Sequence, residues 1–231
     1  MDESLTTETI EAARSGRSRE SGSMRELLVH QWRPLLLCFL ITMGGTVAFY
    51  TYSVNGPNIV KGAFAGDDVV TGTVINLIAL TILMLLQPLG GWISDIVGRK
   101  TLLVFFGVGG VLYTWFLITW LPQQTSPVAA FAILVGGFVI LTGYTSINAV
   151  VKAELFPTHI RALGVGFGYA LANSMFGGTA PLLFQAANGA DQVPLFIGYV
   201  TVAIAASLVV YVVFLSNTGR NWLDDEAGMH E

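Results

Sequence analysis

Long apolar runs separated by short polar connections dominate the pattern of this chain. Six runs are long enough to cross a bilayer as helices, and they cover residues 34–55, 69–93, 101–121, 127–151, 161–187 and 193–215. A hydrocarbon core about 30 Å thick requires about 20 mostly apolar residues per helix. A β-barrel would instead need alternating segments of about 10 residues, which these uninterrupted runs do not resemble. The pattern therefore predicts six transmembrane helices.

Composition agrees with this interpretation and excludes an ordinary soluble domain. Hydrophobic residues make up 53% of the 231 positions and charged residues only 11%. That charged share is roughly half of what soluble domains carry. The single cysteine, Cys38, lies inside the first predicted span, so no intrachain disulfide can form, and we expect a small buried apolar residue there.

The cations predict how the helices are oriented. If the N-terminus is inside, Lys61 alone is outside, and ten of the eleven Lys and Arg residues fall on the cytoplasmic side. These are Arg14, Arg17, Arg19, Arg25, Arg33, Arg99, Lys100, Lys152, Arg161 and Arg220. Cytoplasmic connections of membrane proteins are enriched in Lys and Arg. We therefore expect both termini in the cytoplasm and a multi-pass protein of the cell inner membrane, with the lipid bilayer as its surroundings.

The two ends of the chain differ from its apolar middle. Residues 1–32 are polar, mixed in charge and poor in large apolar side chains, which predicts a cytoplasmic linker and not a signal peptide. The end of this segment, MRELLVHQWR, has the composition of a helix on the membrane surface, with Trp32 at headgroup level. The six-helix domain is expected at 33–219 and a cytoplasmic C-terminal tail at 220–231.

The connection between the second and third spans reads GGWISDIVGRKT. Gly91, Asp95, Gly98, Arg99 and Lys100 match the pattern G-x-x-x-D-x-x-G-R-[KR]. We expect Gly91 to admit another backbone, and Asp95 and Arg99 to meet opposite charges or helix dipoles at adjoining helix ends. Such a link can form in one conformation and break in another. The alternative is a tight turn that only carries cytoplasmic charge.

The connection between the fourth and fifth spans, AELFPTHIRA, is the second charged hairpin. Pro157 ends one helix and starts the next, and Glu154 and Arg161 fall on either side of the turn. We expect these charges at the membrane face, where they can pair with Arg99 or Asp95 of the other hairpin. Gly164, Gly168 and Ala172 then recur every four residues, which predicts a face for close helix packing.

Together these motifs resemble the major facilitator superfamily of secondary transporters, in its metabolite:proton symporter branch. Within that branch, KAELFPTHIRALGVGFGYALANSMFGGTAP and GGTVAFYTYS are most similar to the α-ketoglutarate permeases. The resemblance covers about residues 24–215 and aligns with the C-terminal six-helix half. It implies an all-α membrane protein that forms one half of the superfamily fold. Residues 1–32 would correspond to the central loop, and an N-terminal six-helix half missing from this chain would be its partner.

Polar side chains within the spans are the candidates for a binding site, because burial in lipid is costly for them. The first and fourth helices of each half line the central cavity in the superfamily fold, so the resemblance selects Tyr50, Tyr144 and Asn148 as substrate-binding candidates. Asn173 of the fifth span joins them. Hydrogen bonding between helices is the alternative role for each. Gly91, Asp95, Gly98, Arg99, Lys100, Glu154 and Arg161 are the candidates for a conformational gate.

The predicted function is proton-coupled symport of a small carboxylate such as α-ketoglutarate, by alternating access. No acidic, basic or histidine side chain is expected near the middle of a span, so the groups that bind the proton and neutralise the carboxylate are expected in the other half. We expect no metal, cofactor, enzyme activity or nucleic-acid partner, because no ligand cluster or nucleophile–base set is present in the sequence. The alternatives are a six-helix scaffold or accessory subunit that does not transport, and a symporter of another metabolite or osmolyte.

Overall fold

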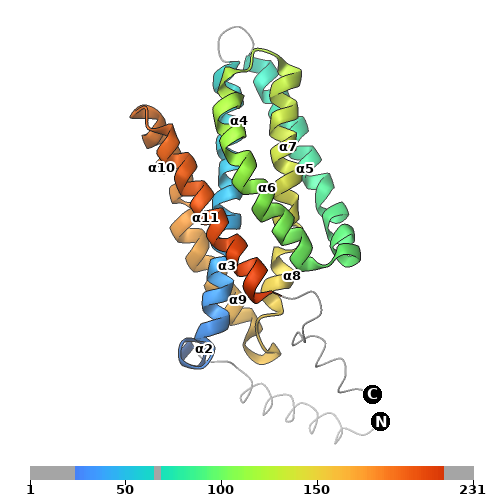
Figure 1. Cartoon of the computed structure of the whole chain (residues 1–231), viewed down its shortest axis with the longest axis vertical. Helices are drawn as coiled ribbons and strands as arrows, with labels where there is room; N and C mark the ends of the chain where they lie inside the picture. The colour runs from blue at the N-terminus through green and yellow to red at the C-terminus, as the bar shows by residue number, and fades with distance from the viewer. Residues whose placement is uncertain (1–23, 65–68, 216–231) are drawn as a thin grey trace, which may run out of the picture.

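The computed structural model describes residues 24–64 and 69–215, and every regular element in these ranges is a helix (Figure 1). The predicted tail and most of the predicted linker lie outside the described residues. The elements are α2 (Met24–Val29), α3 (Trp32–Tyr50), η1 (Thr51–Asn55), α4 (Gly56–Ala63), α5 (Val69–Val97), α6 (Arg99–Trp120), η2 (Leu121–Gln123), α7 (Pro127–Thr145), α8 (Asn148–Ala153), α9 (Thr158–Ala172), η3 (Asn173–Gly177), α10 (Thr179–Gly189) and α11 (Val193–Phe214). Of these, η1 and η3 are π-helices and η2 is a 3₁₀-helix.

Five helical stretches of the described chain are long and apolar enough to cross a membrane. They are Trp32–Ala63, Val70–Val97, Arg99–Gln123, Pro127–Ala153 and Val193–Phe214, and they confirm five of the six predicted spans. The sixth predicted span, 161–187, is not among them. That segment consists of α9, the π-helix η3 and α10, with a turn at Gly178 between η3 and α10.

The helices pack in pairs that are distant in sequence. Helix α11 lies against α3 and α6, and α7 lies against α5 and α6 (Figure 1). Polar contacts fix α11 on α3: Ser207 Oγ donates to the Leu40 carbonyl at 2.6 Å and accepts from the Gly44 amide at 2.9 Å. A Cβ on Gly44 would lie only 2.6 Å from Ser207 Oγ, so glycine permits this approach. Small residues and short polar contacts are the usual means of joining helices within lipid.

The contact between α3 and α9 confirms the predicted packing role of the small residues on α9. A Cβ on Gly168 would lie 2.9 Å from Cys38 Sγ, and one on Gly164 would lie 2.5 Å from the Phe156 ring. Ala172 and Cys38 are fully buried. Gly168 therefore lets α9 approach α3, and Gly164 lets the Phe156 ring pack against α9. Helix α9 and the η3 turn that follows it each carry one side chain into the site described below.

Helix α2, within the predicted linker, packs against α9. Leu27 is fully buried in a small cluster with Phe156 and Ile160. Nearby, His159 Nε2 lies 3.0 Å from Glu26 Oε1. The last part of the predicted linker thus includes a short helix that is attached to the helical bundle.

Candidate functional site

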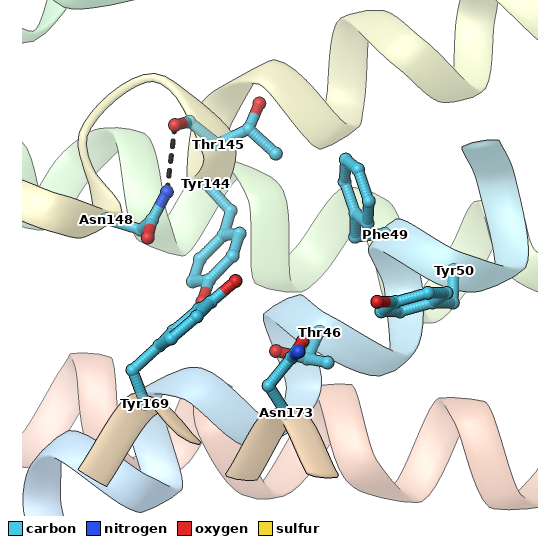
Figure 2. Close-up of a pocket in the computed structure, with 8 residues that line it drawn as sticks. All are labelled: Thr46, Phe49, Tyr50, Tyr144, Thr145, Asn148, Tyr169 and Asn173. Carbon is cyan, nitrogen blue, oxygen red and sulfur yellow. Dashed lines mark hydrogen bonds between the residues drawn. The ribbon is translucent and has the colours of Figure 1, made fainter. Parts of the chain in front are cut away.

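A pocket of about 260 Å³ lies between α3, the junction of α7 and α8, and the junction of α9 and η3 (Figure 2). Its lining residues are Thr46, Phe49, Tyr50, Tyr144, Thr145, Asn148, Tyr169 and Asn173. The four residues selected from the sequence, Tyr50, Tyr144, Asn148 and Asn173, are all among them. The fold therefore brings all four substrate-binding candidates, from Tyr50 to Asn173, to one place.

The helices around the pocket lose regular α geometry at its level. Tyr50 immediately precedes the π-helix Thr51–Asn55, and Asn173 begins the π-helix Asn173–Gly177. Helices α7 and α8 are separated by residues 146–147. Local π-helical turns are frequent at functional sites, and interrupted helices line the binding sites of many transporters. The pocket therefore shares its interrupted helices with the binding sites of transporters.

A glycine on α3 makes room for the central side chain of the site. Tyr144 is 4% exposed, and its ring lies 5.3 Å from that of Phe106, centroid to centroid. On the other side, a Cβ on Gly45 would overlap the Tyr144 ring. The ring is thus packed between α3 and α6, and Tyr144 is also one of the residues that line the pocket. Figure 2 shows the side chains of Tyr144 and Tyr169 converging from their separate helices.

Asn148 is held in position by two hydrogen bonds. Its Nδ2 donates to the Thr145 carbonyl at 2.9 Å (dashed in Figure 2), and its Oδ1 accepts from Lys152 Nζ at 3.0 Å. The first bond uses a carbonyl that the break between α7 and α8 leaves available. The amide therefore has a defined orientation on the wall of the pocket.

Lys152 is the functional candidate that the sequence interpretation missed. The residue was counted among the cytoplasmic cations, yet its side chain is 1% exposed. Its Nζ lies 3.2 Å from the Tyr144 hydroxyl and 4.6 Å from the centre of the Tyr169 ring. The count of cytoplasmic cations gave no sign that the Lys152 side chain is buried among the helices. The physical reason is that helical side chains lean toward the helix N-terminus, so Lys152 points back toward the pocket.

The charge of Lys152 has no acidic partner among the residues that the structure describes. The ion pairs found in those residues are Arg99–Glu154 and His159–Glu26. Within the described part of the chain, the hydrogen-bond and ring partners of Lys152 Nζ are neutral: the Asn148 amide oxygen, the Tyr144 hydroxyl and two tyrosine rings. A buried charge is costly unless it is compensated. Lys152 thus places a positive charge, without an acidic partner in the described residues, next to the side chains that line the pocket.

The two charged hairpins meet, as the sequence predicted. Arg99 and Glu154 form an ion pair, so the start of α6 is joined to the end of α8. Lys100 Nζ donates to the Val212 carbonyl of α11 at 2.7 Å. Gly98, at the start of α6, has a φ of 89°, a conformation that favours glycine. These contacts explain three positions of the first motif.

The other gate candidates take different positions. Asp95 is exposed and forms no ion pair within residues 24–64 and 69–215. Arg161 donates from Nε to the Phe156 carbonyl at 3.2 Å, which secures its own hairpin. The expected close approach at Gly91 is wrong, because a Cβ there would meet nothing within 4 Å in the part of the chain that the structure describes. Gly90 makes a close approach instead, toward Thr142 of α7 and Ser146, which follows that helix.

A second hollow, of about 390 Å³, lies between α10 and α11. Its lining is mainly aliphatic and aromatic, with Gln192 as the amide. It lacks the convergent hydroxyl and amide groups of the first pocket. A crevice of this kind suits an acyl chain or a neighbouring helix better than a polar metabolite.

Comparison with known proteins identifies what the chain is similar to. Residues 3–222 match the family described as "Sugar (and other) transporter". The alpha-ketoglutarate permease of Escherichia coli K12 is 36% identical over 193 residues, which cover 83% of this chain and 44% of the permease. The ectoine/proline transporter of Corynebacterium glutamicum is 31% identical, over 71% of this chain and 33% of that protein. A citrate-proton symporter of Klebsiella pneumoniae is 26% identical, over 69% and 36%.

These relatives are transporters and not enzymes. The chain spans less than half of the length of each of them. No solved structure matches it significantly.

Proposed function

This chain belongs to the sugar (and other) transporter family of the major facilitator superfamily, and from that premise we propose that it is one half of a proton-coupled symporter for a small carboxylate such as α-ketoglutarate. The proposed mechanism is alternating access, in which two halves move about a central site. The proposed location is the inner membrane, with both termini in the cytoplasm.

The observation that carries this proposal is a pocket for a small molecule in front of a buried ammonium group. Asn148 supplies an amide and Tyr144 a hydroxyl, and both are hydrogen-bonded to Lys152. Carboxylates bind such donors through short charge-assisted hydrogen bonds. The names of two of the relatives, alpha-ketoglutarate permease and citrate-proton symporter, agree with this substrate class.

A zwitterionic osmolyte is the second candidate substrate. Four aromatic residues, Phe49, Tyr50, Tyr144 and Tyr169, line the pocket, and aromatic faces bind quaternary ammonium groups. The similarity to an ectoine/proline transporter supports this alternative. A scaffold that does not transport is less well supported, because it would need neither the polar pocket nor the buried cation.

We place the proton-coupling group in an N-terminal half. The lining of the described pocket consists of hydroxyl, amide and aromatic side chains, without an acidic or histidine residue. Proton-coupled transport requires a group that gains and loses a proton within the membrane. A second six-helix half would supply that group together with the opposite wall of the cavity. The Arg99–Glu154 contact would hold the cytoplasmic side of this half in one of the two facing states.

The direct test is uptake into lipid vesicles under an inward proton gradient. The purified chain is reconstituted alone and after co-expression with the N-terminal half of the alpha-ketoglutarate permease, and labelled α-ketoglutarate is supplied. We expect gradient-dependent accumulation by the paired form, with competition from citrate and little from glycine betaine. Accumulation that glycine betaine abolishes would favour the osmolyte alternative. Accumulation by the chain alone would contradict the need for a second half.

A further inference from the structure

We infer that Lys152 is the residue of this half that binds a substrate carboxylate and selects net anions over zwitterions. This inference rests on the proposed function, because it names the group that recognises the proposed substrate class. It assigns a role to a side chain outside the immediate lining of the pocket, behind Tyr144, Asn148 and Tyr169.

The position of the ammonium group allows it to reach a substrate. An ammonium has three N–H donors. The Tyr144 hydroxyl, at 3.2 Å, and the Asn148 amide oxygen, at 3.0 Å, accept two of them. The remaining direction faces the Tyr169 ring, whose centre is 4.6 Å away. Tyr169 is 45% exposed, so its side chain has room to turn aside when a carboxylate oxygen takes its place.

The uncompensated charge of Lys152 favours the replacement of the Tyr169 ring by a carboxylate oxygen. Lys152 is 1% exposed and has no carboxylate partner in the described residues, so its charge is compensated only by dipoles and aromatic faces. An incoming carboxylate would replace an aromatic contact by a charge-assisted hydrogen bond. An anion therefore gains more from this site than a neutral molecule of the same shape.

The same ammonium disfavours a quaternary ammonium group in the pocket. Such a group would bind to the faces of Tyr144 and Tyr169, and Lys152 already occupies both rings. It would also place a second positive charge beside the first. The relatives include transporters named for anions and for zwitterions, so Lys152 is a residue that can separate these two substrate classes.

The experiment compares Lys152→Gln and Lys152→Arg with Lys61→Gln, which removes the same charge from an exposed position on α4. Binding of α-ketoglutarate and of glycine betaine is measured by calorimetry in lipid nanodiscs. The samples are the chain alone and its complex with the N-terminal half of the alpha-ketoglutarate permease. We expect Lys152→Gln to weaken α-ketoglutarate binding by at least about tenfold and to leave glycine betaine binding unchanged or stronger. Lys152→Arg retains part of the affinity, and Lys61→Gln stays within about twofold of the wild type.

Three outcomes would overturn the inference. Unchanged α-ketoglutarate affinity in a folded Lys152→Gln variant would show that the ammonium does not bind the carboxylate, and would leave the proposed function standing. An equal loss for both ligands would show that Lys152 only supports the structure. A wild-type protein without carboxylate affinity in either form would contradict the proposed function and the inference together. Melting temperature and elution volume identify variants that are not folded.

Discussion

Arg99 at the start of α6 is ion-paired with Glu154 at the end of α8, so one contact joins the two charged hairpins. The Arg99 side chain is 38% exposed and that of Glu154 is 9% exposed. Ion pairs at such partly exposed positions stabilise a fold by only about 0–1 kcal/mol. The contact is therefore better suited to bias one conformation than to support the bundle.

Arg99→Ala is expected to reduce transport more than it reduces the amount of protein in the membrane. Loss of the ion pair removes little stability but releases the contact between the two hairpins. Uptake rate divided by membrane abundance measures the effect, with the paired protein as the sample. A double variant, Arg99→Glu and Glu154→Arg, restores a pair of opposite charges and should recover part of the uptake rate. Normal uptake in Arg99→Ala and Glu154→Gln would refute the gating role.

Tyr50→Phe and Asn148→Ala are expected to weaken substrate binding without preventing folding. Both residues line the pocket, and each variant removes a polar group there. A net hydrogen bond contributes about 0.5–1.5 kcal/mol, which corresponds to a twofold to roughly tenfold loss of affinity. Titration calorimetry with α-ketoglutarate gives the value. If protein yield falls while affinity holds, these residues serve in helix packing instead.

Gly45→Ala is expected to displace the Tyr144 ring and to disturb the pocket from behind. The added Cβ would overlap that ring, which cannot retreat because Phe106 lies on its other side. Overpacking of this kind typically costs about 1–3 kcal/mol. Thermal unfolding monitored by circular dichroism should show a lower Tm. Gly166→Ala is the matched control, because a Cβ there meets nothing within 4 Å and its Tm should not fall.

Ser207→Ala is expected to loosen α11 from α3. The substitution removes the donor to the Leu40 carbonyl and the acceptor of the Gly44 amide. Hydrogen bonds between helices in membranes contribute about 0.6 kcal/mol on average, so a loss of about 1 kcal/mol is expected for the two. Ser174→Ala, at an exposed position, is the control. Equal unfolding curves for both variants would show that the two Ser207 hydrogen bonds do not stabilise the contact between α3 and α11.

Much of the fold could be predicted from the lengths of apolar runs and the spacing of small and polar residues in the sequence. Five spans were predicted by the length of their apolar runs, and the packing face of α9 by the four-residue spacing of Gly164, Gly168 and Ala172. The spacing of polar residues within spans, together with the family resemblance, selected four residues that line one pocket. In each case a repeat along the helix fixes which side chains share a face.

The features that the sequence did not predict depend on the directions of side chains and on irregular backbone geometry. Lys152 was counted only as a cytoplasmic cation, although Tyr144, Asn148 and Lys152 recur every four residues. The structure brings these three side chains together across the break between α7 and α8. The four-residue spacing could have identified Lys152. The predicted span at 161–187 is divided by a turn at Gly178, directly after the π-helix Asn173–Gly177, and apolar length does not reveal this turn. Gly90 and Gly91 are adjacent, and only the packing of α5 on α7 decides which of them is in contact.

The π-helical turn at Thr51–Asn55 also determines which direction the side chains and carbonyls of the following helix, α4, face around the helix axis. A regular α-helix turns by about 100° per residue, so a segment that accommodates one extra residue rotates the following part relative to a regular continuation. In the observed phase, the Pro57 carbonyl of α4 accepts a hydrogen bond from Asn76 Nδ2 at 2.8 Å. Deleting one residue from Thr51–Asn55 would keep the helix almost as long but turn Pro57 away from Asn76. The hydrogen bond that joins α4 to α5 therefore depends on the π-helical turn beside the pocket.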